Sequence, residues 1–235
     1  MSPSPLPPNL IPEISAFVTK CMAAHDPSHN PQHVHRVVSL ANQILARETA
    51  RNTSSSSSTV YNAEVVHLAA LLHDIGDRKY LSQVAAISES IRSKQQGATT
   101  ATTTNSSEAV DPERLVYHVL LAHGVGEEVA EKPEEVKRLI ADGYPELGIV
   151  QDADRLDAIG AVGIGRCFTF LGAKGKNFCP EGMWVMDNAI EHFEEKLVRL
   201  EGMMKTETGR EMAKVRTARL REFQGWWADE MKDAV

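Results

Sequence analysis

The segment from Ala63 to Asp74 constrains the fold of this 235-residue chain more than any other. It is apolar from Val65 to Leu72, nearly all round a helix of 3.6 residues per turn, which is typical of a helix enclosed by other helices. The segment ends in His73-Asp74, so an imidazole and a carboxylate stand side by side at the edge of the core. This pair is a candidate part of a divalent-metal site, provided that other segments supply further ligands.

Apolar residues recur at helical spacing along most of the remaining chain, and no alternating β-branched run indicates a strand. Further helices are predicted at Ile11–Met22, from Gln32 onward, at 84–91, from Asp111 to near Gly124, at Pro133–Leu139, within Leu147–Phe170, at Trp184–Met203 and at Arg210–Met231. In the last of these, Val215, Leu220, Phe223, Trp226 and Trp227 are predicted to be core residues. Gly160, Gly163 and Gly165 are expected to allow close approach of another backbone segment. We therefore predict an all-α, single-domain helical bundle spanning 11–235.

Three polar or proline-rich stretches interrupt this pattern. Residues 1–10, with four prolines, are predicted to be a disordered leader, and 51–59 and 93–108, rich in Ser and Thr, are predicted to be flexible insertions.

Composition narrows the class of function. The net charge is −7, with 25 Lys and Arg against 32 Asp and Glu, and there is no basic block, which argues against binding to a nucleic-acid backbone. No apolar run is long enough to span a bilayer, and the N-terminus lacks a secretory signal pattern. Three widely spaced cysteines without a CxxC pair favour a reducing compartment. We expect a cytoplasmic protein, with the nucleus as the alternative, that forms no membrane contact.

A divalent-metal site needs donors from several elements, because one helix face cannot surround an ion. Candidate donors on separate predicted helices are His33, the His73-Asp74 pair, and one of Asp152, Asp154 and Asp157. Asp154 and Asp157 are three residues apart and share a helix face, whereas Asp152 points elsewhere. Mixed imidazole and carboxylate donors suit Mn²⁺, Mg²⁺, Fe²⁺ or Co²⁺ and do not choose among them.

Three motifs follow one another in the order H…HD…D, and a fourth motif lies nearer the C-terminus. They are His29-Asn-Pro-Gln-His-Val-His-Arg-Val37, Ala70-Leu-Leu-His-Asp-Ile-Gly-Asp77, Gln151-Asp-Ala-Asp-Arg-Leu-Asp-Ala-Ile-Gly-Ala161 and His192-Phe-Glu-Glu-Lys-Leu197. Together they resemble the HD-domain metal-dependent phosphohydrolases, in particular a subgroup of small bacterial and fungal enzymes. The resemblance covers about residues 11 to 230 apart from the two insertions.

The resemblance implies an all-α fold that binds one or two divalent ions through His33, His73, Asp74 and Asp154. His35, two residues along the same helix, is the alternative to His33 as the first metal ligand. The family usually has Asp where this chain has Asn30, a departure expected to affect a helix cap or a neighbour of the ligands. It also usually has His-Ser where this chain has His123-Gly124, which leaves the part played by His123 open.

Asp77 and the ligand Asp74 are the predicted catalytic residues, Asp77 by orienting a water molecule or passing a proton. Arg36, Lys79, His123 and Lys196 are predicted to bind the substrate by offsetting charge on phosphate oxygens. Each has an alternative: Asp77 as a cap or ion-pair partner, and Lys196 in a surface ion pair with the acidic residues around it.

The expected function is hydrolysis of a small phosphorylated metabolite, most simply a nucleotide. Cleavage of nucleoside triphosphates to monophosphate and pyrophosphate is the leading hypothesis, and a nucleoside monophosphate phosphatase is the alternative. From another class, a metal-stabilised nucleotide-binding or regulatory module without turnover would keep the same fold. A homodimer is a further possibility.

Overall fold

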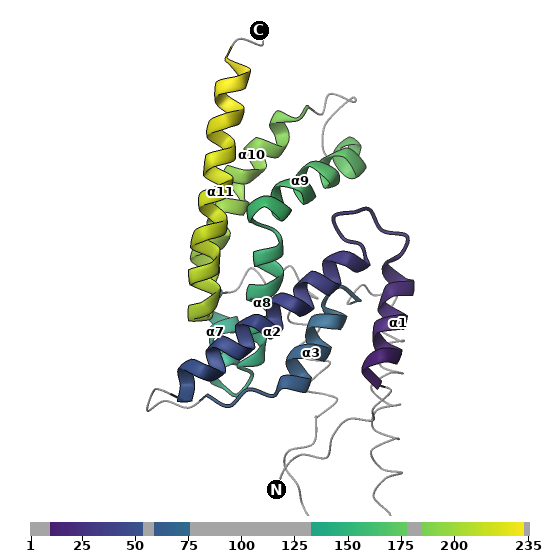
Figure 1. Ribbon diagram of the computed structural model, residues 1–235, viewed down its shortest axis with the longest axis vertical. Coiled ribbons are helices and arrows are strands. Elements are labelled where there is room, and N and C mark those ends of the chain that lie inside the picture. The colour runs from purple at the N-terminus through teal and green to yellow at the C-terminus, as the bar shows by residue number, and fades with distance from the viewer. Residues whose placement is uncertain (1–9, 54–58, 76–132, 178–184, 233–235) are drawn as a thin grey trace, which may run out of the picture.

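The computed structural model describes residues 10–53, 59–75, 133–177 and 185–232 (Figure 1). Every regular element in these ranges is helical, so the all-α prediction is confirmed. The elements are α1 (Leu10–Met22), α2 (Pro31–Thr53), α3 (Ala63–Leu72), η1 (His73–Ile75), α7 (Pro133–Ala141), α8 (Glu146–Asp157), α9 (Gly160–Lys174), η2 (Gly175–Asn177), α10 (Asp187–Glu195), η4 (Leu197–Met203) and α11 (Glu207–Met231). The helices predicted at 84–91 and 111–124, the insertion at 93–108 and the leader up to residue 9 lie outside the described residues.

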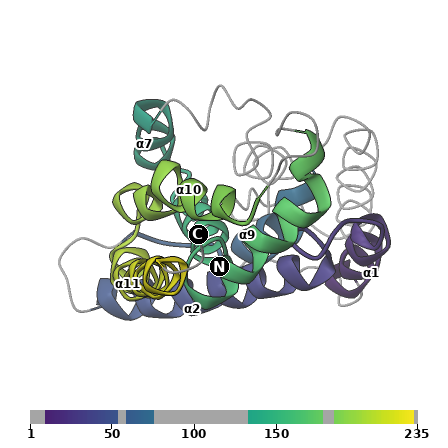
Figure 2. The same cartoon turned by 90° about the horizontal axis from the view of Figure 1, so that it is seen from above.

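Helices α2, α3 and α8 form the centre of the bundle, with α2 packed along both of the others. Helix α3 is enclosed as predicted, because Val66, Leu68, Ala69 and Ala70 are fully buried. Helix α1 covers α3 at one end of α2, and α11 packs over α8, α9 and the other end of α2 (Figures 1 and 2). The site described below lies where α2, η1 and α8 meet.

Polar side chains fix where three of the helices begin. The Asn30 side chain accepts hydrogen bonds from the backbone N–H groups of Gln32 and His33, so it caps the start of α2 ahead of Pro31. Asn62 caps α3 and Thr206 caps α11 in the same way. The cap at Asn30 sets the register that turns His33 inward.

A sharp bend separates α8 from α9, and their axes differ by 69°. Ala158 and Ile159 form the joint, and Gly160 after them has a φ of +76°, a left-handed conformation that favours glycine. A Cβ at Gly163 would overlap the carbonyl of Ala158, whereas a Cβ at Gly165 would meet no atom within 4 Å. A Cβ at Gly160 would lie 3.1 Å from the Cβ of Arg216 on α11. Close approach is thus confirmed at Gly160 and Gly163 but not at Gly165.

Two further predictions need correction. Helix α2 continues through Thr53, three residues into the predicted insertion at 51–59, and Arg51 in this extension forms ion pairs with Glu48 and Glu211. On α11, Leu220 is buried and Trp227 packs on Phe168, but Val215 and Trp226 are 55% and 57% exposed. Periodicity marks an apolar face but does not show how much of it a neighbour covers.

Within the described residues no single helix is long and apolar enough to cross a membrane. The bent pair α8 and α9 passes that test jointly, by length and composition only.

Candidate metal centre

His33 lies on the first turns of α2 with its side chain 1% exposed, and both of its ring nitrogens are engaged. Its Nδ1 atom is 2.7 Å from Oδ2 of Asp157, and its Nε2 atom faces the opposite way, toward η1. Burial opposes protonation of this imidazole, but hydrogen bonds to Asp157 and Asp74 outweigh burial and raise the pKa of His33 to about 9. Its surroundings therefore stabilise a positive charge. A proton and a metal ion would compete for the same lone pair.

His73 and Asp74 lie on the buried turn η1, which directly follows α3. The Nδ1 atom of His73 is 2.8 Å from the carbonyl oxygen of Ala70. A carbonyl only accepts, so Nδ1 carries the proton and the lone pair of Nε2 is directed into the site. The tight turn therefore presents the imidazole and the neighbouring carboxylate of Asp74 to the same space.

Four donors converge on this space. The Nε2 atoms of His33 and His73 are 3.1 Å apart, and they lie 3.2 and 3.4 Å from the carboxylate oxygens of Asp74. Oδ1 of Asp154, on α8, is 3.5 Å from the first imidazole and 3.8 Å from the second. Three of these side chains are buried, whereas that of Asp154 is 39% exposed.

These distances suit a divalent ion. Donors that each bind one ion at about 2.1 Å stand roughly 3.0–3.4 Å from one another in octahedral or tetrahedral geometry. His33, His73 and Asp74 also offer three ligand atoms that all lie within 4.8 Å of one another. Two imidazole lone pairs and two carboxylates facing one another repel unless a cation separates them, so the residues present fit the metal that the resemblance implies.

Asp157 was one of three candidate donors in the sequence, and the structure places it behind a donor, against Nδ1 of His33. Its carboxylate, 1% exposed, accepts hydrogen bonds from Nε and Nη2 of Arg36 at 2.7 and 3.0 Å. Arg166 of α9 forms an ion pair with it at 3.0 Å. Burial alone would raise the pKa of Asp157, but the bonds from His33 and Arg36 hold it at about 2. The only sequence signal was the spacing from Asp154, which places both carboxylates on one helix face.

The remaining predicted residues differ in where they lie. His35 is exposed, so His33, and not its competitor, faces the other donors. Arg36 is 33% exposed and already pairs with Asp157, and Lys196 is exposed at the end of α10, so their substrate-binding roles stay predictions. Asp77, Lys79 and His123 lie outside the described residues. Asp152 points away from the donors, as predicted, and accepts hydrogen bonds from Lys205 and Thr206.

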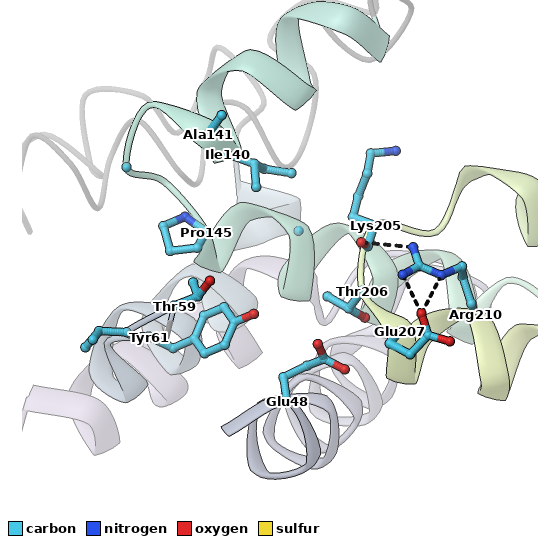
Figure 3. A pocket seen from close by; sticks show the side chains of 13 residues that line it. Glu48, Thr59, Tyr61, Ile140, Ala141, Pro145, Lys205, Thr206, Glu207 and Arg210 are labelled. Atoms are coloured by element: carbon cyan, nitrogen blue, oxygen red, sulfur yellow. Dashed lines mark hydrogen bonds and ion pairs between the residues drawn. The ribbon is translucent and has the colours of Figure 1, made fainter. Parts of the chain in front are cut away.

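A separate cavity of about 590 Å³ lies beside the N-terminal end of α8, whereas the donors lie at its C-terminal end (Figure 3). It is lined by Glu48, Tyr61, Gly148, Lys205 and Arg210 among others, and by none of the four donors. The guanidinium of Arg210 is already bound to Glu207 and to two backbone carbonyls, as the dashed lines of Figure 3 show in part. This cavity is therefore not the centre to which the four donors belong.

The chain belongs to the HD domain family, whose match covers residues 32–159, from the start of α2 to the bend after α8. It is 33% identical over 215 residues to YpgQ, an uncharacterised protein of Bacillus subtilis, covering 87% of this chain and 85% of that one.

Solved structures agree with this assignment. A crystal structure of B. subtilis YpgQ has a TM-score of 0.66 at 27% identity, covering 96% of this chain and 97% of that one. YpgQ in complex with ADP has a TM-score of 0.64, also at 27% identity, covering 95% and 98%. An HD-superfamily hydrolase from Bacillus thuringiensis has a TM-score of 0.58 at 26% identity, covering 95% and 97%. HD domains typically bind divalent metals, and His33, His73 and Asp74 form a His-His-Asp cluster in this chain.

Proposed function

We propose that this protein is a divalent-metal-dependent phosphohydrolase that acts on a nucleotide. The observation that carries the proposal is the convergence of His33, His73 and Asp74 at the spacing of one coordination shell, with Asp154 beside them at 3.5 and 3.8 Å from the two imidazoles. The side chain of Asp154 is 39% exposed, so one side of that shell is partly accessible to solvent. A shell that is buried on one side and open on the other is expected of a catalytic ion, because a purely structural ion is normally enclosed by protein ligands.

A nucleotide is proposed because the related YpgQ was crystallised with ADP. A bound divalent ion supplies Lewis acidity, which activates a water molecule and polarises a phosphoryl oxygen. The protein contributes placement and charge. Asp74 and Asp154 bring the negative charge that retains the ion, and Arg36 lies one turn beyond His33 on α2, where its cationic side chain is partly exposed.

Asp77 is our candidate for orienting the attacking water, and Lys79 and His123 for stabilising charge on the phosphate. These roles rest on the resemblance, as does the role of Lys196. Mn²⁺ is our first choice of ion, and Mg²⁺, Fe²⁺ and Co²⁺ suit the same donors.

The proposed reaction is cleavage of a nucleoside triphosphate to the monophosphate and pyrophosphate. The test is a panel of nucleoside tri-, di- and monophosphates with Mn²⁺, Mg²⁺ or Co²⁺, in which phosphate and pyrophosphate are measured separately. Pyrophosphate released from triphosphates would support the proposal. Phosphate released from monophosphates would favour the monophosphatase instead.

A non-catalytic nucleotide-binding module is the competing function from another class. Turnover that is lost on replacing Asp154 by Asn, while the melting temperature of the metal-free protein is kept, would exclude it. Mn²⁺ binding without turnover of any nucleotide would overturn the proposed reaction and leave the metal centre in place.

A further inference from the structure

The carboxylate of Asp157 joins three elements of the bundle. Asp157 is the last residue of α8. Its carboxylate accepts one hydrogen bond from His33 and two from Arg36, and both of these residues lie on α2. From α9, Arg166 approaches to 3.0 Å, and the Nε of that arginine donates to the backbone carbonyl of Ser28 at 2.7 Å. The carboxylate is therefore fixed from several directions and has little freedom to rotate.

We propose that Asp157 is a positioning residue for the metal centre: it holds the proton of His33 on Nδ1 and thereby keeps the Nε2 lone pair aimed at the ion. The inference deepens the proposed function and rests on the metal centre described there. A carboxylate behind a ligating imidazole fixes both its tautomer and its ring orientation, and makes the imidazole a more basic ligand.

The two arginines explain how a buried carboxylate can serve in this way. An isolated carboxylate 1% exposed would be costly to keep ionised. Paired with the guanidinium groups of Arg36 and Arg166, Asp157 stays ionised and accepts only. It therefore cannot donate a proton to Nδ1, and the tautomer of His33 is decided by charge as well as by distance.

The competing explanation is that Asp157 only ties α2, α8 and α9 together. Replacing Asp157 by Asn separates the two, because Asn has nearly the same shape but carries no charge. The oxygen beside His33 also faces Arg36 and Arg166, so the amide would turn its oxygen to this position and accept from Nδ1 as a neutral, weaker partner. The proton would then be held less firmly on Nδ1, and Nε2 would be a less basic ligand. Replacing Arg166 by Met weakens the link to α9 but leaves the bond between Asp157 and His33 intact.

The experiment measures Mn²⁺ affinity by titration calorimetry for the wild-type protein and for D157N, R166M and D152N. We expect D157N to bind Mn²⁺ roughly 10- to 100-fold more weakly, the usual cost of losing a partner behind a metal ligand. D152N is the matched control: it is the same substitution on the same helix, at a fully buried carboxylate that binds Lys205 and Thr206. Its affinity for Mn²⁺ should equal that of the wild type, even if its melting temperature falls.

Wild-type affinity in D157N would overturn the positioning role. So would equal losses of affinity in D157N and R166M at equal losses of melting temperature, since that result is expected of a clamp alone. Wild-type protein that binds no Mn²⁺ would instead overturn the metal centre of the proposed function. If D157N does not fold, ¹⁵N NMR of the wild-type protein with diamagnetic Zn²⁺ decides. A His33 ring protonated at Nδ1 and bound through Nε2 supports the inference, and the reverse arrangement overturns it.

Discussion

His33 and His73 direct their Nε2 atoms at each other across 3.1 Å, while the Nδ1 atom of each is bound to an acceptor behind it. One acceptor is the carboxylate of Asp157 and the other is the carbonyl of Ala70. Once a metal ion displaces the proton that these surroundings favour on His33, both rings present lone pairs to a common point. The predictions on metal binding follow from this geometry.

Replacing Asp74 by Asn should nearly abolish Mn²⁺ binding. The substitution removes a buried negative charge 3.2 Å from Nε2 of His33 and offers the ion a much weaker donor. The loss in affinity should exceed the roughly 10- to 100-fold expected for residues that only support a ligand. Titration calorimetry with Mn²⁺ measures it, with D142N, at an exposed position, as the control. Equal affinities of D74N and D142N would contradict the donor set.

Mn²⁺ should raise the melting temperature of the wild-type protein, because the ion binds the folded state alone. At a free concentration 100 times its dissociation constant, a ligand adds about 2.7 kcal/mol to the free energy of unfolding. H33Q should lose this increment, whereas H35Q, altered at an exposed side chain, should keep it. Scanning calorimetry with Mn²⁺ and with EDTA makes the comparison. Loss of the increment in H35Q but not in H33Q would reverse our assignment.

Alanine at Gly163 should destabilise the protein, and alanine at Gly165 should not. At Gly163 the added methyl group overlaps the carbonyl of Ala158, and relieving such overpacking costs about 1–3 kcal/mol. At Gly165 the added methyl group enters open space on the same helix, and Ala is favoured over Gly within a helix by about 0.5–1 kcal/mol. Urea unfolding of both variants gives the difference, and the tight joint would be disproved if the two shifts had the same sign.

Stability should depend on pH through Lys205. Burial, helped by the charge of Arg155, lowers the pKa of its amine to about 8 in the folded protein, against about 10.4 in the unfolded chain. Between these values the unfolded state binds more protons, so the free energy of unfolding gains a contribution as pH rises. K205M lacks this contribution. In urea unfolding, the free energy of unfolding of the wild type should therefore rise relative to that of K205M from about pH 7 to pH 10. K214M, at an exposed position, is the control, and parallel curves for wild type and K205M would refute the expectation.

Local patterns were enough to predict most of the described helices. Apolar spacing identified α1, α2, α3, α7 and α11 to within a few residues, since each buries one face or, for α3, its whole circumference. The order of His33, His73, Asp74 and Asp154 predicted four side chains that the structure brings close together, while their role as metal ligands stays a prediction. The family usually has Asp where this chain has Asn30, and the predicted effect of this difference included a helix cap, which is where Asn30 lies.

Features that depend on partners distant in the sequence were not predictable in this way. The part played by Asp157 depends on Arg36, 121 residues away, and on Arg166 beyond a bend. The bend itself depends on the left-handed conformation of Gly160, which is one of several glycines in that stretch. The exposure of Trp226 reflects the absence of a covering element among the described residues, a property of the tertiary structure and not of the helix.

The joint at Ala158 and Ile159 sets a strict length requirement. In one straight helix, Asp157 and Arg166 would be separated by about 13 Å along the axis, at 1.5 Å per residue. The 69° bend brings the guanidinium back to 3.0 Å from the carboxylate. One residue inserted after Gly160 would turn the rest of α9 by about 100° and carry Arg166 away from Asp157. Related chains that keep this pair of side chains should therefore vary freely in loop length elsewhere but preserve the number of residues between them.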